Sequence, residues 1–277
     1  MARNLLTAVS ILSNRSKSTA TTDHSTPRVI FLSPHLDDVA LSCGGLIAQA
    51  SEKHAIEIWS LFSQAPLIGR PSPLAKWLHS ESHAFSGKSL FRTRRFEDKA
   101  ACKALGVKSV HYSLHDAVYR RDENGSHLYT SSRQEQWKPA DDILVERIVA
   151  ILTENVRIND AIVAPAGIGN HVDHLIVRSA AERATGRRVT FYAEIPYIVK
   201  CEEDLAIKLG GLSEAQYRLT ESSTRQWIKA VSAYASQLPM LEKAYGRIDE
   251  LIATLSQRVQ CLYGNESRLV LQRLGVA

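Results

Sequence analysis

A polar cluster follows the first apolar run of the chain. Residues 29–32 are apolar, and Ser33-Pro34 then lead into His35, Asp37 and Asp38. An imidazole and two carboxylates this close together are groups that bind a metal ion or move a proton. The same pattern is also typical of a plain helix start with a solvated histidine, because aspartate often caps a helix. Taken alone, the cluster leaves both interpretations open.

A second polar cluster occurs far along the chain in the same setting. The apolar run 161–165 leads through a glycine-containing segment to His171, Asp173 and His174, and a helical pattern follows. If both apolar runs are parallel strands, the loops after them share one edge of the sheet. We therefore expect the two clusters to meet in space.

Together the clusters offer the groups of a metal-dependent hydrolase. Three ligands drawn from histidine and aspartate, with a fourth position left to water, are typical of a catalytic zinc site. Zinc lowers the pKa of its water from about 15.7 to about 7. A neighbouring carboxylate can then take the proton of that water, and a protonated imidazole can stabilise an oxyanion. The two clusters contain more polar groups than three ligands require.

The two clusters, in this order, resemble the motifs of the PIG-L/LmbE-like family of zinc-dependent N-deacetylases. The matching segments are SPHLDD at 33–38, followed by Gly44-Gly45, and HVDH at 171–174. Weaker matches lie at 94–107 and 229–237. The resemblance extends from about residue 29 into the C-terminal region. Members of the family act on N-acetylglucosamine-type groups in glycolipids, thiol glycosides and antibiotic precursors.

The resemblance implies a role for each residue that matches a motif. It makes His35, Asp38 and His174 the ligands of Zn²⁺, or of another divalent metal. It makes Asp37 the general base that takes a proton from the attacking water.

The resemblance also implies partners for the transition state and the substrate. His171 becomes the imidazole that faces the developing oxyanion, with Asp173 orienting it. Arg94 aligns with a substrate-contacting arginine, and Asp116 with an acidic residue that holds sugar hydroxyls.

The chain departs from the family pattern at a few positions. Leu36 and Val172 stand where the family often has proline. Some members place a tyrosine shortly before the position of His171, where this chain has the segment 167–170 without one. Tyr119 and Tyr197 are candidates to supply the missing hydroxyl.

The expected activity is removal of an N-acetyl group from an amino sugar or glycoconjugate. The alternatives are an amidase that cleaves a larger N-acyl or sugar-conjugate amide, and a non-catalytic glycan-binding relative. Gly44-Gly45 do not form a dinucleotide fingerprint, because they fall inside the predicted helix and lack the required spacing. A two-metal phosphoesterase is disfavoured because it would need more carboxylates.

Composition excludes several other classes. The 277 residues are 44% hydrophobic with a net charge of +5, which is ordinary for a globular protein. No apolar run approaches the ~18 residues of a membrane helix, and no nucleic-acid-binding motif occurs. We expect a small-molecule partner and make no prediction of oligomeric state.

The cysteines and the N-terminus indicate the compartment. The four cysteines are widely spaced without a C-x-x-C pair, which favours a reducing environment over a disulfide framework. Cys43 lies near the first cluster, but we expect it to be a small buried residue. Residues 1–28 form a serine- and threonine-rich leader without a convincing signal peptide. We therefore expect a cytoplasmic protein.

Strand and helix patterns alternate from residue 29 onward. Strands are expected at 29–33, 56–62, 109–114, 160–165 and 188–194. Helices are expected at 39–52, 91–105, 141–156, 173–185, 203–209, 221–234 and 238–260. This alternation predicts an α/β protein with a Rossmann-like three-layer fold, a mostly parallel sheet and a helical C-terminal extension.

The same pattern predicts the domain organisation. Residues 29–277 are expected to form a single deacetylase domain whose C-terminal helices begin near residue 201. Two long irregular stretches, 63–90 and 117–139, are expected to form a flap and part of the substrate wall.

Overall fold

The computed structural model describes residues 26–50, 54–65, 69–130 and 137–276. Residues 1–25 of the predicted leader lie outside this part of the chain, so that prediction stays untested. Within the described ranges, no helix has the length and apolar character needed to cross a membrane.

One sheet forms the centre of the fold, with the strand order β3-β2-β1-β4-β5-β7-β6. Its strands are β1 (Arg28–Ser33), β2 (Ala55–Ser60), β3 (Lys108–His111), β4 (Ala161–Pro165), β5 (Thr190–Tyr192), β6 (Glu214–Tyr217) and β7 (Gln260–Tyr263). Strands β1 to β5 pair in parallel, whereas β7 pairs antiparallel to both β5 and β6. The predicted mostly parallel α/β sheet is confirmed.

The strand order reverses beside β1. The chain runs outward from β1 through β2 to β3, and then returns to the other side of β1 as β4. Phe31 of β1 lies opposite Val163 of β4 in parallel register. In open α/β sheets, such a reversal leaves a crevice at the carboxyl ends of the two strands, where ligands bind.

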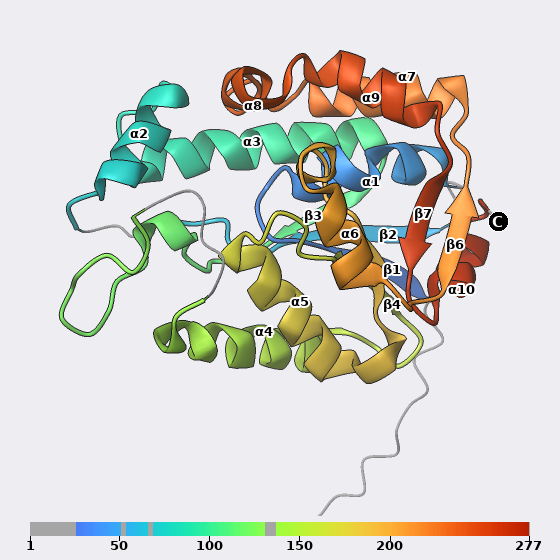
Figure 1. Cartoon of the computed structure of the whole chain (residues 1–277), viewed down its shortest axis with the longest axis horizontal. Coiled ribbons are helices and arrows are strands. Elements are labelled where there is room, and N and C mark those ends of the chain that lie inside the picture. The colour runs from blue at the N-terminus through green and yellow to red at the C-terminus, as the bar shows by residue number, and fades with distance from the viewer. Residues whose placement is uncertain (1–25, 51–53, 66–68, 131–136, 277) are drawn as a thin grey trace, which may run out of the picture.

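Helices cover both faces of the sheet (Figure 1). One face carries α1 (Asp38–Gln49) and α3 (Gly87–Leu105), and the other carries α4 (Asp142–Asn155) and α5 (Val172–Thr185). The alternation of side chains along β1 explains the two layers. Val29 and Phe31 join the core under α1 and α3, whereas Ile30 and Leu32 join the core over α4 and α5.

The chain beyond residue 200 differs from the prediction of an all-helical extension. The strands β6 and β7 extend the sheet, and the predicted helix 238–260 is two helices followed by β7. The helices of this region are α6 (Glu202–Leu209), α7 (Glu221–Val231), α8 (Leu238–Tyr245), α9 (Ile248–Ser256) and α10 (Ser267–Arg273). Gly246, at a φ of 80°, ends α8, because glycine adopts this left-handed conformation without steric cost.

The stretch 63–90, predicted as one irregular flap, contains regular structure. It includes α2 (Pro73–Glu81), and α3 begins at Gly87 rather than at residue 91. Ser72 caps α2 by accepting the N–H of Ala75, and Ser86 forms a capping box with Ser89. These serines were the features of the sequence that could have indicated where the two helices begin.

Candidate functional site

The loop after β1 is held by Ser33 rather than by an aspartate cap. The Ser33 hydroxyl donates to the carbonyl of His35 at 2.6 Å and accepts the N–H of Val39 at 3.1 Å. Asp37 occupies the cap position of α1 but its side chain makes no capping hydrogen bond. The alternative interpretation as a plain aspartate cap therefore does not hold for Asp37, while Asp38 accepts the N–H of His35 at 2.7 Å.

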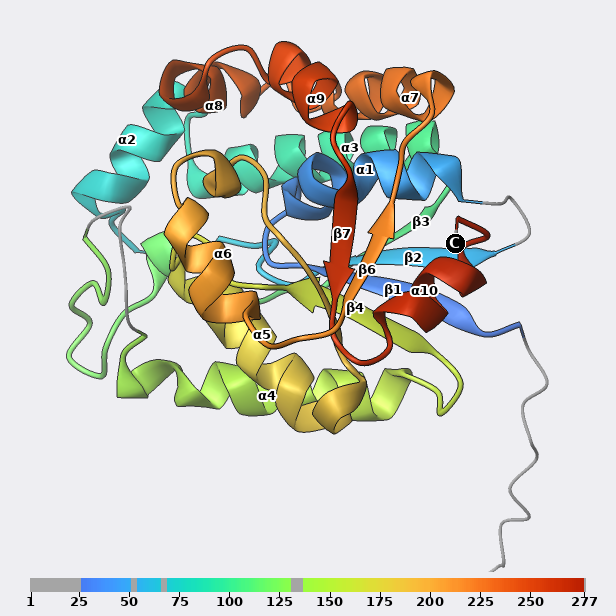
Figure 2. The same ribbon diagram turned by 45° about the vertical axis from the view of Figure 1, so that its right-hand side comes forward.

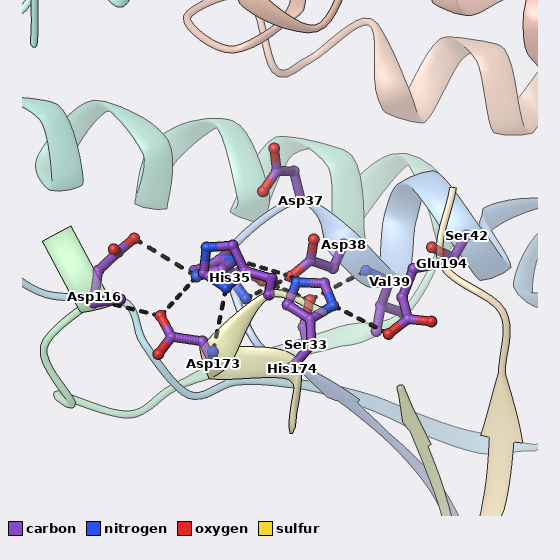
Figure 3. Close-up of polar contacts among 12 residues, drawn as sticks. Ser33, His35, Asp37, Asp38, Val39, Ser42, Asp116, Asp173, His174 and Glu194 are labelled. Atoms are coloured by element: carbon purple, nitrogen blue, oxygen red, sulfur yellow. Dashed lines mark hydrogen bonds and ion pairs between the residues drawn. The ribbon is translucent and has the colours of Figure 1, made fainter. Parts of the chain in front are cut away.

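Two imidazole nitrogens, one from each cluster, lie against the same oxygen of Asp38. Nδ1 of His35 lies 3.2 Å from Oδ2 of Asp38, and Nε2 of His174 lies 3.3 Å from the same oxygen. All three residues are buried. Figure 3 shows these side chains drawn together from the β1–α1 loop and the start of α5. The predicted meeting of the clusters is thus seen directly, across more than half of the chain.

Each of the two imidazoles turns its other nitrogen toward a buried carboxylate. Nε2 of His35 lies 3.0 Å from Oδ2 of Asp173, and Nδ1 of His174 lies 3.1 Å from Oε1 of Glu194. In Figure 3, Asp173 and Glu194 lie on opposite sides of the histidine pair. Metal-binding histidines are commonly oriented by a carboxylate in this way.

The donor set fits a divalent cation. Nε2 of His174 is buried and makes no hydrogen bond to any residue in the described ranges, although the Asp38 carboxylate is adjacent. Burial lowers the pKa of His174, but Asp38 and Glu194 outweigh burial and raise it to about 9. The same negative field attracts a metal ion. Nitrogen and carboxylate donors in this combination suit a divalent metal ion.

His171 stands beside the donor set. Its ring centroid lies 4.8 Å from that of His35 and 5.3 Å from that of His174. Burial and the charge of His35 lower its pKa to about 3. Nδ1 of His171 accepts the backbone N–H of Asp173 at 3.2 Å, so the ring hydrogen lies on Nε2.

Asp173 contacts different groups from those we expected. We expected its carboxylate to orient His171, but that carboxylate accepts from Nε2 of His35 and from the N–H of Ala117. It also pairs with Nη1 of Arg120 at 2.5 Å. The backbone of Asp173, rather than its carboxylate, makes the contact with His171.

Arg94 contacts the candidate base. Nη2 of Arg94, from α3, donates to Oδ1 of Asp37 at 2.8 Å, and both side chains are buried. Nε of Arg94 is buried without a hydrogen-bond partner among the described residues. Asp116 lies nearby, with Oδ2 3.7 Å from Nε2 of His35, and burial raises its pKa. The structure therefore places the two predicted substrate residues close to the candidate metal ligands and the candidate base.

The two tyrosine candidates have different positions. The Tyr119 hydroxyl forms a 2.8 Å hydrogen bond with Nε2 of His79, a residue of α2. Tyr197 lies edge-on to His174 with ring centroids 5.5 Å apart. Its ring fills the space beside Gly169, where a Cβ would come within 2.9 Å of the ring. Tyr197 is thus the tyrosine that lies at the site.

Sequence reasoning missed the role of Arg120. This arginine is buried and pairs with Asp173 and Asp141. Its guanidinium lies between the rings of Phe62 and Tyr129, at 5.3 and 5.2 Å. No sequence signal distinguishes it from the exposed Arg121 beside it.

Comparison of the sequence with known proteins finds one family and two curated relatives. The sequence model of the PIG-L family, described as GlcNAc-PI de-N-acetylase, matches residues 30–185. A 2'-N-acetylparomamine deacetylase from Streptomyces fradiae is 28% identical over 174 residues, covering 61% of this chain and 57% of the relative. A 2'-N-acetylparomamine deacetylase from Niallia circulans is 30% identical over 186 residues, covering 61% and 66%. The chain thus matches less than two thirds of the length of either relative.

Solved structures with the same fold include antibiotic deacetylases. The zinc-inhibited form of teicoplanin deacetylase Orf2 has 26% identity and a TM-score of 0.70, over 85% of this chain and 97% of that one. The A40926 pseudoaglycone deacetylase Dbv21 has 24% identity and a TM-score of 0.66, over 86% and 96%. The second likeness supports the fold alone.

Proposed function

This chain belongs to the PIG-L family of GlcNAc-PI de-N-acetylases, and from that premise we propose that it is a metal-dependent hydrolase that removes an N-acetyl group from an amino sugar or glycoconjugate. The observation that carries the proposal is the convergence of His35 Nδ1 and His174 Nε2 on Oδ2 of Asp38. These donors come from two distant loops at the strand-order reversal, where a ligand crevice is expected.

His35, Asp38 and His174 would hold the metal, for which we propose Zn²⁺. A divalent ion bound there supplies Lewis-acid polarisation of the amide carbonyl and lowers the pKa of a bound water. Asp173 and Glu194 hold the two imidazoles in the orientation that presents Nδ1 of His35 and Nε2 of His174. In this assignment Asp37 and His171 are not ligands, although a ligand atom of His171 lies within 4.8 Å of those of His35 and His174.

Asp37 is the proposed general base. Arg94 fixes Oδ1 of Asp37, so the other carboxylate oxygen is available for a water molecule. As the water oxygen bonds to the acetyl carbon, its proton passes to Asp37. When the C–N bond breaks, Asp37 returns the proton to the leaving amine nitrogen. The products are the free amino group and a carboxylic acid, which ionises in water.

His171 is the proposed oxyanion partner. Its Nδ1 accepts a backbone N–H, so Nε2 is the nitrogen that donates to the developing negative oxygen. For the substrate, we propose that Asp116 holds sugar hydroxyls and that the unpartnered Nε of Arg94 donates to the bound molecule. The curated relatives are named for an acetylated aminoglycoside precursor, which supports an amino-sugar substrate.

The proposed compartment is the cytoplasm. All four cysteines are free thiols, as expected for a protein in a reducing environment.

The test is metal content per chain followed by acetate release. We expect about one zinc per chain in the wild type and little in His174→Ala, with His54→Ala as the control outside both clusters. The zinc-loaded protein is then assayed with 2'-N-acetylparomamine and N-acetylglucosamine, beside matched amides with longer acyl groups. Acetate release that disappears in His174→Ala supports the proposal. A zinc-free wild type after metal supply, or faster cleavage of long acyl groups, would contradict it.

A further inference from the structure

A cavity of about 430 Å³ lies at the end of the sheet formed by β5, β7 and β6. Its walls come from β5, β6 and β7, from α9, and from the first part of α1. Figure 2 shows β7 and β6 at this end of the sheet, with α9 next to the start of β7. None of the proposed metal donors or acid–base residues lines this cavity.

The segment 194–199 separates the cavity from the candidate site. Glu194 and Tyr197 face His174, whereas Ile195 and Ile198 of the same segment line the cavity. The N–H of Ile195 donates to the Ser42 hydroxyl at 3.0 Å, which fixes the segment against α1. A molecule in the cavity would therefore lie behind the site wall, without reaching the metal donors.

The lining combines aliphatic, aromatic and neutral polar side chains with a single cation. Leu251, Leu255 and Ile198 provide aliphatic surface, and Tyr217 provides a buried aromatic ring. Arg258 is exposed and lines the cavity, which places it at the opening. It is the only Lys, Arg, Asp or Glu among the lining residues, and no ion pair engages its guanidinium within the described ranges. The cavity thus combines an aliphatic wall with a positive charge at its mouth that has no ion-pair partner in the described part of the chain.

The size of the cavity suits one small amphiphile. An apolar protein cavity of about 150 Å³ is enough to hold benzene, and ligand pockets typically measure about 300–1,000 Å³. Burying aliphatic carbons against leucine and isoleucine is favourable, because it removes apolar surface from water. A medium-length alkyl chain fits both the volume and the chemistry of the lining.

We propose that this cavity is a binding site for one medium-chain aliphatic carboxylate, with its alkyl chain among Leu251, Leu255 and Ile198 and its carboxylate paired with Arg258. The site is independent of the proposed deacetylase activity. A cationic amphiphile of the same length is disfavoured, because its ammonium group would face Arg258 and no carboxylate is among the lining residues.

The test is isothermal titration of the zinc-supplied full chain with octanoate, beside octylamine and acetate. We expect octanoate to bind with one site per chain and octylamine to bind at least about tenfold more weakly, because the charged contact is reversed in sign. Excess acetate is expected to leave octanoate binding unchanged, because acetate can reach a metal but has no chain to fill the cavity.

Two variants locate the bound molecule. Leu255→Trp fills the cavity and is expected to abolish octanoate binding at an unchanged melting temperature. Arg258→Gln alters an exposed side chain and is expected to weaken binding about tenfold, whereas the exposed control Arg268→Gln leaves it unchanged. Displacement of octanoate by acetate, or equal binding by Arg258→Gln and wild type, would overturn the proposal whatever the outcome of the deacetylase assays.

Discussion

The carboxylate of Glu194 lies 3.1 Å from Nδ1 of His174, and neither side chain is exposed to solvent. The same carboxylate accepts the N–H groups of Gly167 and Ile168 at 2.5 and 3.1 Å. Glu194 thus ties the loop after β4 to the histidine at the start of α5. With Nδ1 engaged in this way, Nε2 of His174 is the nitrogen directed at Asp38.

This relationship predicts the effect of Glu194→Gln on metal binding. The amide keeps the size of the side chain but loses the charge that orients and polarises the imidazole. We expect zinc affinity, measured by competition with a chelator, to fall about 10- to 100-fold. Glu182→Gln, on the exposed part of α5, is the control. Unchanged zinc affinity in a folded Glu194→Gln protein would show that Glu194 does not position the ligand.

The Asp37→Asn variant tests the proposed general base without removing a proposed metal ligand. The amide oxygen can still accept from Arg94, so the buried arginine keeps a partner. We expect zinc content to stay at the wild-type level, because Asp37 is not among the converging donors. Turnover is expected to fall about 100-fold or more, with a smaller change in KM, because the proton acceptor is lost. Wild-type turnover in this variant would assign the base to another residue.

The stability of the folded protein at acidic pH is expected to depend on Asp160. This buried carboxylate accepts the backbone N–H of Arg28 at 2.9 Å and pairs with Nη2 of Arg28 at 2.6 Å. Burial opposes ionisation of Asp160, but the hydrogen bonds from Arg28 and Arg157 hold its pKa below the usual value. Its folded pKa is therefore lower than its unfolded pKa of about 3.9. The resulting stabilisation is present above about pH 4 and is lost as pH falls through the folded pKa.

Chemical denaturation of Asp160→Asn at several pH values tests this expectation. At pH 7 the variant is expected to be about 2 kcal/mol less stable than the wild type, because charge-assisted hydrogen bonds are lost. The difference is expected to shrink toward about pH 3. The exposed Glu221→Gln, which breaks a surface pair with Arg225, is the control and is expected to show little change. A difference that is constant with pH would contradict the assignment.

The sequence was sufficient to predict the meeting of the two clusters. Parallel strands bring their carboxyl ends to one edge, so the apolar runs before His35 and His171 already placed both loops together. The partner of the Asp173 carboxylate was not predictable in the same way. His35 and His171 lie close together, and only the orientation of the rings decides which of them that carboxylate contacts.

The C-terminal half was harder to predict for a different reason. The strands β6 and β7 contain four residues each, too few for alternation to be distinguished from a helical pattern. The contact of Glu194 with His174 was not predictable either, because it depends on the path of the chain after β5. The sequence alone also did not show why residues 44 and 45 are glycines. The structure does, because the ring of Trp227 from α7 packs directly against both positions.

Gly44→Ala tests that packing. Alanine is favoured over glycine inside a helix by about 1 kcal/mol, so local propensity predicts stabilisation. A Cβ at this position would lie 2.3 Å from Cδ1 of Trp227, whose ring is buried and donates from Nε1 to the Ala40 carbonyl at 2.8 Å. Because the ring cannot move without losing that bond, we expect a net destabilisation of about 2 kcal/mol in thermal unfolding. In a Trp227→Leu background the same change should cost less, since the clash is removed; an equal cost in both backgrounds would mean that the Gly44–Trp227 contact is not the reason for glycine.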